Sequence, residues 1–209
     1  MGTHDPIPTL KFERQAWKAG ALSVAGVDEV GVGPLAGPVT AGVVMLEPRR
    51  RPKWYRHVRD SKVLPERVRV ELSAEIRASV PWAIGWASVE EIDCLNIYRA
   101  RKLCMVRAID RLSRVPDAII SDALRLPLRN VNAVIDGDAL SIAVAAASII
   151  AKVERDALMD RLCEQYPGYG FCHNKGYPTP EHKALLLRRG PCPVHRRSFA
   201  PVAQFGLGL

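Results

Sequence analysis

Carboxylates stand where several short apolar segments of this sequence come to an end. Residues 24–27 form one such segment, and the four acids that share the placement are Asp28, Glu29, Asp122 and Asp138. An unpaired carboxylate is costly inside a sheet, but acids at the points where strands emerge can converge on a shared cation. Hard ions such as Mg²⁺ prefer oxygen ligands, and two of them can hold the attacking and leaving oxygens of a phosphodiester. The pattern therefore indicates a metal-dependent phosphodiester chemistry.

A structural role competes with this interpretation. Each of the four acids, taken alone, is better explained as a helix cap or a turn residue. For the whole set, in a basic chain, metal binding and structural roles both stay open. Asp136 is a fifth candidate, and its position directly before Gly137 fits a plain turn equally well.

The composition is that of a globular protein with a basic surface. The chain has 209 residues and 23.0 kDa, with 48% hydrophobic and 25% charged residues, which excludes a wholly disordered chain. A net charge of +8 suggests a polyanionic partner such as a nucleic acid. No apolar run approaches the roughly 18 residues of a membrane helix, and the first residues do not resemble a secretory signal. The five cysteines lack CxxC spacing, so we expect reduced thiols, no structural zinc and a cytoplasmic location.

Strands precede an alternation of strands and helices along the chain. Apolar segments at 24–27, 39–46, 82–89, 117–121 and 132–135 predict strands, and the Gly- and Pro-rich residues 31–38 predict a tight turn. Helical spacing predicts a helix over 97–112, capped by Asn96, and another from Ser141 to about residue 166. These elements predict an α/β domain with a mixed sheet. We expect an N-terminal extension over 1–20, a catalytic domain over 21–166 and a substrate-facing segment over 167–209 packed on the same domain.

Residues 25–39, AGVDEVGVGPLAGPV, closely resemble the signature of bacterial type 2 ribonuclease H, the ribonuclease HII family. Further blocks agree with that family in the same order. They are DSKVL at 60–64, GDALS at 137–141, AAASIIAKVERD at 145–156, YPGYGF at 166–171, KGY at 175–177 and HRRSFAP at 195–201.

The resemblance implies an RNase H-like fold, with a mixed five-stranded sheet flanked by helices and a C-terminal extension of helices and loops. It implies an endonuclease that cleaves the RNA strand of RNA–DNA hybrids and cuts 5′ of single ribonucleotides in duplex DNA, with roles in replication and ribonucleotide excision repair. The four acids named above would hold two Mn²⁺ or Mg²⁺ ions. Hydrolysis would leave a 3′-hydroxyl and a 5′-phosphate. The substrate-binding positions would be Gly31, Val32, Gly33, Ser61, Lys62, Lys152 and Tyr177.

Within this set, the resemblance assigns Tyr177 to sensing the ribose 2′-hydroxyl and Lys62 to the substrate backbone. Lys152 fits a phosphate contact, or equally a helical pair with Asp156 at i,i+4 spacing. Lys175, Arg196 and Arg197 are secondary candidates for phosphate contacts. We expect the protein to act as a monomer on hybrids or ribonucleotide-containing duplexes, away from membranes.

One departure from the family pattern bears on function. Val32 stands where the family usually has arginine. The Gly- and Pro-rich residues 31–38, here called the glycine loop, therefore lack the positive charge and the N–H donors of a guanidinium. An alternative is therefore a catalytically weakened, or altered-specificity, hybrid-binding protein of the same fold. Another RNase H-like nuclease or strand transferase, such as a resolvase, is a further alternative, although it would lack the block at 28–38.

Overall fold

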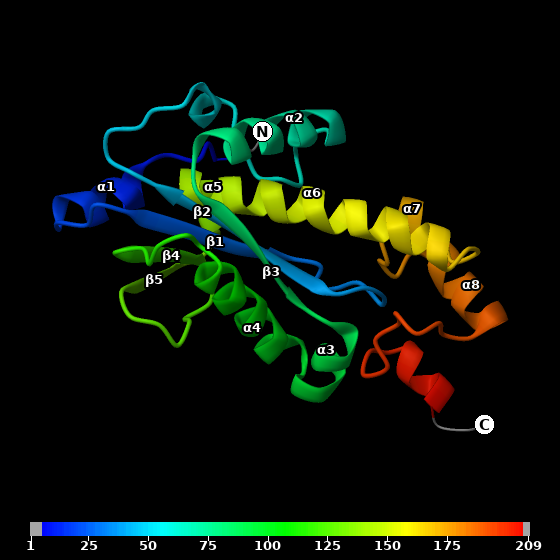
Figure 1. Cartoon of the computed structure of the whole chain (residues 1–209). Coiled ribbons are helices and arrows are strands. Elements are labelled where there is room, and N and C mark those ends of the chain that lie inside the picture. Colours follow the sequence, from blue (N-terminus) through cyan, green and yellow to red (C-terminus); the bar gives the residue numbers. More distant parts are fainter. Residues whose placement is uncertain (1–5, 207–209) are drawn as a thin grey trace, which may run out of the picture.

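The computed structural model describes residues 6–206, and its centre is one five-stranded sheet. The strands are β1 (Val24–Val30), β2 (Val39–Leu46), β3 (Trp82–Ala87), β4 (Ala118–Asp122) and β5 (Val131–Val134), in the spatial order β3-β2-β1-β4-β5 (Figure 1). β1 pairs antiparallel with β2, and β2 pairs antiparallel with β3, whereas β1–β4 and β4–β5 are parallel pairs. The predicted mixed five-stranded sheet is confirmed.

Helices cover both faces of this sheet. On one face the long α6 (Ile142–Gln165) lies against β1 and β2, with α2 (Glu66–Ser79) outside it, and on the other face α4 (Ile97–Asp110) lies against β2 and β3. β2 shows why both faces are apolar: Val43 and Met45 pack toward α4, while Val44 and Leu46 pack toward α6. Because side chains alternate along a strand, a continuous apolar run predicts a strand buried on both sides.

Two glycines let α6 approach the sheet closely. A Cβ on Gly26 of β1 would lie 2.2 Å from the Ala143 carbonyl carbon, and one on Gly42 of β2 would lie 2.3 Å from the Ala147 carbonyl oxygen. The alanine-rich start of α6 therefore rests directly on these strands. Ser141 caps this helix by accepting a hydrogen bond from the Val144 amide.

The smaller elements lie around this core. They are α1 (Lys11–Lys18), the 3-10 turn η1 (Lys53–Arg56), α3 (Val89–Leu95), α5 (Gly137–Leu140), α7 (Phe171–Asn174), α8 (Pro180–Arg189) and the 3-10 turn η2 (Val202–Gly206). Asn96 caps α4 as predicted, accepting a hydrogen bond from the Arg99 amide. The predicted strand 82–89 ends at Ala87, because Ser88 forms a capping box that begins α3.

Both ends of the described chain are tied to the centre of the fold. The buried Glu13 of α1 accepts hydrogen bonds from the Ser141 hydroxyl at 2.7 Å and the Ala143 amide at 2.9 Å, at the start of α6. Near the other end, Ala36 and His195 form an isolated antiparallel bridge. Within residues 6–206, no helix combines the length and apolar character needed to cross a membrane.

Candidate active site

One cavity of about 290 Å³ brings the predicted site residues together. All four acids line it, and so do all seven residues expected to contact substrate: Asp28, Glu29, Asp122, Asp138, Gly31, Val32, Gly33, Ser61, Lys62, Lys152 and Tyr177. Val30, Arg101 and Ser148 complete the lining. A larger cavity of about 520 Å³ lies between the end of α4 and the β4–β5 connection, but Asp110 is the one acid that lines it.

The sheet topology explains why the acids meet. β1 and β4 run parallel, with Val27 opposite Ser121, so Asp28 lies level with Asp122 at the end of β4. The expectation that the first strand ends before Asp28 is wrong, because β1 continues to Val30 and both Asp28 and Glu29 still pair with β2. Asp138 lies on α5, and the Gly137 amide donates a hydrogen bond of 2.7 Å to Asp122 Oδ1. This hydrogen bond between α5 and β4 thus fixes Asp138 relative to Asp122.

The acids are buried close enough to repel one another. Asp28 is 4% exposed, and burial raises its pKa well above the ordinary value, with a further rise from the charges of Glu29 and Asp122. Burial likewise raises the pKa of Glu29 to about 7, although Arg101 opposes that rise. Burial, then the charge of Asp138, raises the pKa of Asp122. Such a cluster favours either bound protons or bound cations.

Two cations of the chain partly balance this charge. Lys62 Nζ lies 3.2 Å from Asp138 Oδ2, and Arg101 contacts Glu29 Oε1 through Nε at 2.6 Å and Nη2 at 2.5 Å. The second oxygen of the buried Glu29, Oε2, has no hydrogen-bond partner among residues 6–206. An orphaned carboxylate oxygen among other acids is a free ligand atom.

The donor set suits a hard divalent cation. All four side chains offer carboxylate oxygen, which Mg²⁺ and Mn²⁺ prefer. Across residues 6–206, no three Asp, Glu, His or Cys side chains are drawn together tightly enough to enclose an ion. The four carboxylates instead surround the cavity, and Lys62 and Arg101 occupy one oxygen each of Asp138 and Glu29. The residues therefore fit a divalent ion that would replace Lys62 at Asp138 and would use the Glu29 oxygen that Arg101 does not contact.

Two buried arginines shape the glycine loop after β1. Arg196 donates to the carbonyls of Gly31, Val32 and Gly37 at 2.6, 2.9 and 2.9 Å. Burial, followed by the charge of Arg155, lowers the pKa of Arg196 to about 9. Because a planar peptide points its N–H opposite to its C=O, the amides of Val32 and Gly33 are directed away from Arg196. The expectation that Arg196 contacts phosphate is wrong, since its guanidinium is buried beneath the loop.

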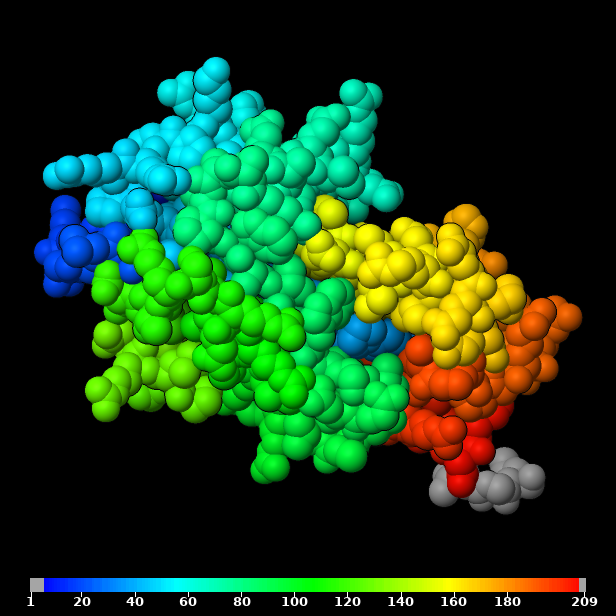
Figure 2. Space-filling model, viewed as in Figure 1, coloured from blue at the N-terminus to red at the C-terminus, as the bar shows by residue number. Residues whose placement is uncertain are grey.

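Arg155 of α6 supports the same loop from a second side and ties it to the loop that carries Tyr177. Its guanidinium donates to the carbonyls of Ala36, Pro38 and Lys175 at 3.2, 3.2 and 3.0 Å. A Cβ on Gly31, where φ is +85°, would lie 2.1 Å from Arg155 Nε, so this position requires glycine. In Figure 2 only a small blue area of the loop shows between the green α3–α4 surface and the yellow and red segments.

The Tyr177 side chain is 41% exposed at the cavity, while its backbone is fixed. The Leu35 amide donates to the Gly176 carbonyl at 2.7 Å, and His182 Nδ1 lies 2.8 Å from the Tyr177 carbonyl oxygen. A Cβ on Gly176 would lie 2.5 Å from the Ala36 carbonyl oxygen. The tyrosine loop thus rests directly on the glycine loop.

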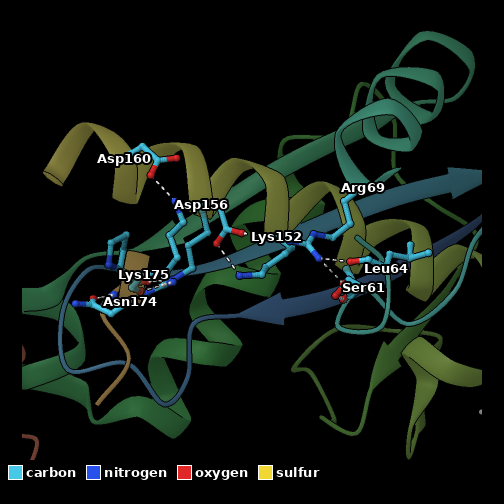
Figure 3. A network of polar contacts seen from close by, with 12 residues as sticks. Ser61, Leu64, Arg69, Lys152, Asp156, Asp160, Asn174 and Lys175 are labelled. Atoms are coloured by element: carbon cyan, nitrogen blue, oxygen red, sulfur yellow. Dashed lines mark hydrogen bonds and ion pairs between the residues drawn. The ribbon is translucent and has the colours of Figure 1, made fainter. Parts of the chain in front are cut away.

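Polar contacts along α6 connect the two sides of the site (Figure 3). Arg69 of α2 donates to the Ser61 and Leu64 carbonyls and lies 3.9 Å from Asp156. Asp156 also accepts a hydrogen bond of 2.7 Å from Lys152, so the helical pairing of these two residues is present. One turn further along α6, Asp160 pairs with Lys175 beside the tyrosine loop. α6 therefore holds the 61–64 turn and the 174–177 loop in one frame.

Sequence reasoning missed several lining or supporting residues. Ser148 hydrogen-bonds Ser61 through their hydroxyls at 2.9 Å, and its own hydrogen bond lowers the pKa of Asp28. Arg101 lies in a helix rich in Arg and Lys, and no spacing distinguishes it from its neighbours. Arg155 lies within a block that resembles the family, but charge alone predicts a solvent-exposed side chain.

Comparisons with known proteins agree with this geometry. A family model described as Ribonuclease HII matches residues 25–202. The chain is 51% identical over 203 residues to a protein named Ribonuclease HII from Anaeromyxobacter sp. (strain Fw109-5), covering 96% of this chain and 63% of that protein. It therefore spans less than two thirds of that relative's length. A protein of the same name from Moorella thermoacetica is 48% identical, with 90% of this chain and 91% of that protein covered. The crystal structure of the ribonuclease H2 from Pyrococcus horikoshii OT3 is similar, with a TM-score of 0.73, 28% identity and coverage of 88% of this chain and 96% of that chain.

Proposed function

Because the chain belongs to the ribonuclease HII family of metal-dependent endonucleases, we propose that it hydrolyses the RNA strand of RNA–DNA hybrids at the cavity described above. We extend the proposal to cleavage 5′ of single ribonucleotides embedded in duplex DNA, with a 3′-hydroxyl and a 5′-phosphate as products. The observation that carries the proposal is the clustering of Asp28, Glu29, Asp122 and Asp138 around one cavity beside a glycine loop.

The four acids would hold two divalent ions, Mg²⁺ or Mn²⁺. When bound, these ions would activate water for attack on the phosphodiester and stabilise the charge that develops on the leaving oxygen. The free Oε2 of Glu29 and the mutual repulsion of the acids support this assignment. Lys62 would leave Asp138 as the ions bind, and its ammonium would then be available to a substrate phosphate.

The glycine loop and Tyr177 would select the substrate. The outward amides of Val32 and Gly33 can donate to the backbone of the bound strand, because Arg196 holds the opposite carbonyls. Telling RNA from DNA requires a contact with the 2′-hydroxyl. Tyr177 would take this role, and its exposed side chain on a backbone held by hydrogen bonds supports the proposal. All of these groups come from one chain, which supports a monomeric enzyme.

A cleavage assay tests the proposal. A full RNA–DNA hybrid, a DNA duplex with one ribonucleotide and an all-DNA duplex are each incubated with Mg²⁺, Mn²⁺ or chelator. We expect cleavage of the first two substrates with either ion, and none in chelator. Cleavage of the all-DNA duplex would instead indicate another nuclease of this fold.

Val32 supports one second candidate, a hybrid-binding protein with weakened chemistry or altered specificity. Its apolar side chain packs against the core on the α4 side of the sheet, so the tip of the loop offers backbone donors and no charge. Hybrid binding without cleavage in Mn²⁺ would favour this candidate.

A further inference from the structure

We propose that Arg101 contacts a phosphate of the bound nucleic acid beside the glycine loop, so that one guanidinium bridges Glu29 and the substrate. This inference rests on the proposed function and adds a substrate-contacting residue to it. Arg101 comes from α4, and its side chain is 24% exposed where it lines the cavity together with Val32 and Tyr177.

The pairing with Glu29 leaves part of the guanidinium unused. Both contacts, from Nε at 2.6 Å and from Nη2 at 2.5 Å, go to the same oxygen, Oε1. A guanidinium carries five N–H donors in a fixed fork. Within residues 6–206, Nη1 of Arg101 donates no hydrogen bond. One edge of the fork is therefore committed to Glu29, and the far nitrogen remains available at the cavity wall.

The other cations near the cavity are committed differently. Lys62 and Lys152 are point charges that each pair with a carboxylate, Asp138 and Asp156 respectively, and must leave it to reach a phosphate. The guanidiniums of Arg155 and Arg196 are buried against backbone carbonyls. Among the described residues that line the cavity, Arg101 is the one arginine.

Bridging two anions is a task that suits arginine. Its planar fork can hold a carboxylate on one edge and a phosphate on another, whereas an ammonium on a flexible stem has no such fixed geometry. A cation that contacts both groups is needed at this site, because four clustered carboxylates repel an approaching phosphate. Val32 adds no donor from its side chain, which packs against the core. Arg101 thus provides a guanidinium at the same wall of the cavity.

Binding measured without cleavage tests the inference. A fluorescently labelled RNA–DNA hybrid is titrated in chelator over a series of salt concentrations, with wild type, Arg101→Met, Arg101→Lys and Arg99→Met. Arg99 is the matched control, since it is an exposed arginine on the same helix and does not line the cavity. We expect Arg101→Met to weaken binding by about tenfold and to reduce the log–log salt slope by roughly 0.9, with Arg101→Lys intermediate. Equal affinities of Arg101→Met and Arg99→Met would overturn the inference.

A double-mutant cycle separates a substrate contact from simple neutralisation of Glu29. If Arg101 contacts phosphate, Arg101→Met weakens binding by a similar factor in the wild-type and Glu29→Gln backgrounds. If it acts only by neutralising Glu29, the effect disappears in Glu29→Gln, and the inference fails. Circular dichroism melting verifies that each variant is folded. If Arg101→Met is unfolded, the affinity of Arg101→Lys for the hybrid tests the inference in its place. Absence of hybrid binding and cleavage by the wild-type protein would instead defeat the proposed function.

Discussion

The imidazoles of His182 and His195 face each other inside the protein, with their Nε2 atoms 3.1 Å apart. The Cys192 amide donates to His195 Nδ1 at 3.0 Å, so the proton of that ring lies on Nε2 and points to His182. His182 then carries its proton on Nδ1 and donates it to the Tyr177 carbonyl at 2.8 Å. This chain of hydrogen bonds fixes the backbone of Tyr177 and requires both rings to be neutral.

The neutral state of His195 predicts a loss of stability in acid. Burial, helped by His182, lowers its pKa from 6.5 to about 4. The unfolded chain therefore takes up the proton first, and the stability from this residue is complete above pH 6.5 and lost as the pH falls toward 4. We expect wild type to lose about 3 kcal/mol relative to His195→Gln over that range, measured by urea unfolding at several pH values. If the free energies of unfolding of wild type and His195→Gln changed in parallel with pH, His195 would not be the neutral, buried group described here.

Replacing Asp28 should separate stability from catalysis. Asp28→Asn removes a buried charge that its neighbours repel, so we expect the metal-free protein to gain about 1–2 kcal/mol at pH 8. Cleavage should disappear and hybrid binding should be largely kept. Asp136→Asn is the control, since Asp136 is exposed and its left-handed backbone accommodates asparagine. Thermal melting in chelator, with cleavage and binding assays, measures each effect, and full activity of Asp28→Asn would refute its role as a metal ligand.

Divalent ions should stabilise the protein more in mildly basic than in acidic solution. With the pKa of Glu29 raised to about 7 from 4.5, the folded metal-free protein retains a proton that the unfolded chain has lost. The stability that Glu29 contributes therefore falls as the pH rises from 4.5 through 7. Above about pH 7 the Glu29 carboxyl is already deprotonated, so a divalent ion binds it without displacing a proton. We expect the melting shift caused by Mn²⁺ to be larger at pH 8 than at pH 6, and less pH-dependent in Glu29→Gln. Equal shifts at both pH values in wild type would count against a site at Glu29.

The hydroxyl of Tyr177 should decide the choice between ribose and deoxyribose. Tyr177→Phe keeps the ring and the backbone hydrogen bonds, so folding stability should not change. We expect kcat/KM for a single-ribonucleotide duplex to fall by about tenfold or more, which brings that substrate nearer to the uncleaved all-DNA duplex. Tyr98→Phe, an exposed tyrosine outside the cavity lining, is the control. Undiminished discrimination by Tyr177→Phe would remove the residue from this role.

Elements whose signals are local can be predicted from the sequence alone. The continuous apolar run at 39–46 predicts β2 with its observed bounds, and the Gly- and Pro-rich residues 31–38 predict the turn before it, because strand burial and turn conformation depend on neighbouring residues. Asn96 is predicted as a cap for the same reason. The sequence also shows that Asp28 directly follows an apolar segment, although it does not decide between a cap and a metal ligand, and it does not reveal that β1 continues to Val30. The sequence does not predict α2 and α8, because each of these helices buries few apolar side chains.

Which side chains support the site depends on contacts between residues that are far apart in the sequence. Arg196 looks like a phosphate contact in the sequence, yet it is buried beneath carbonyls that lie 159 to 165 residues away along the chain. Arg101 approaches Glu29 across 72 residues because α4 packs on the face of the sheet that also receives Val32. The packing of helices on the sheet, which no local pattern encodes, sets such contacts. The same packing determines whether a basic side chain meets solvent, a carbonyl or a carboxylate.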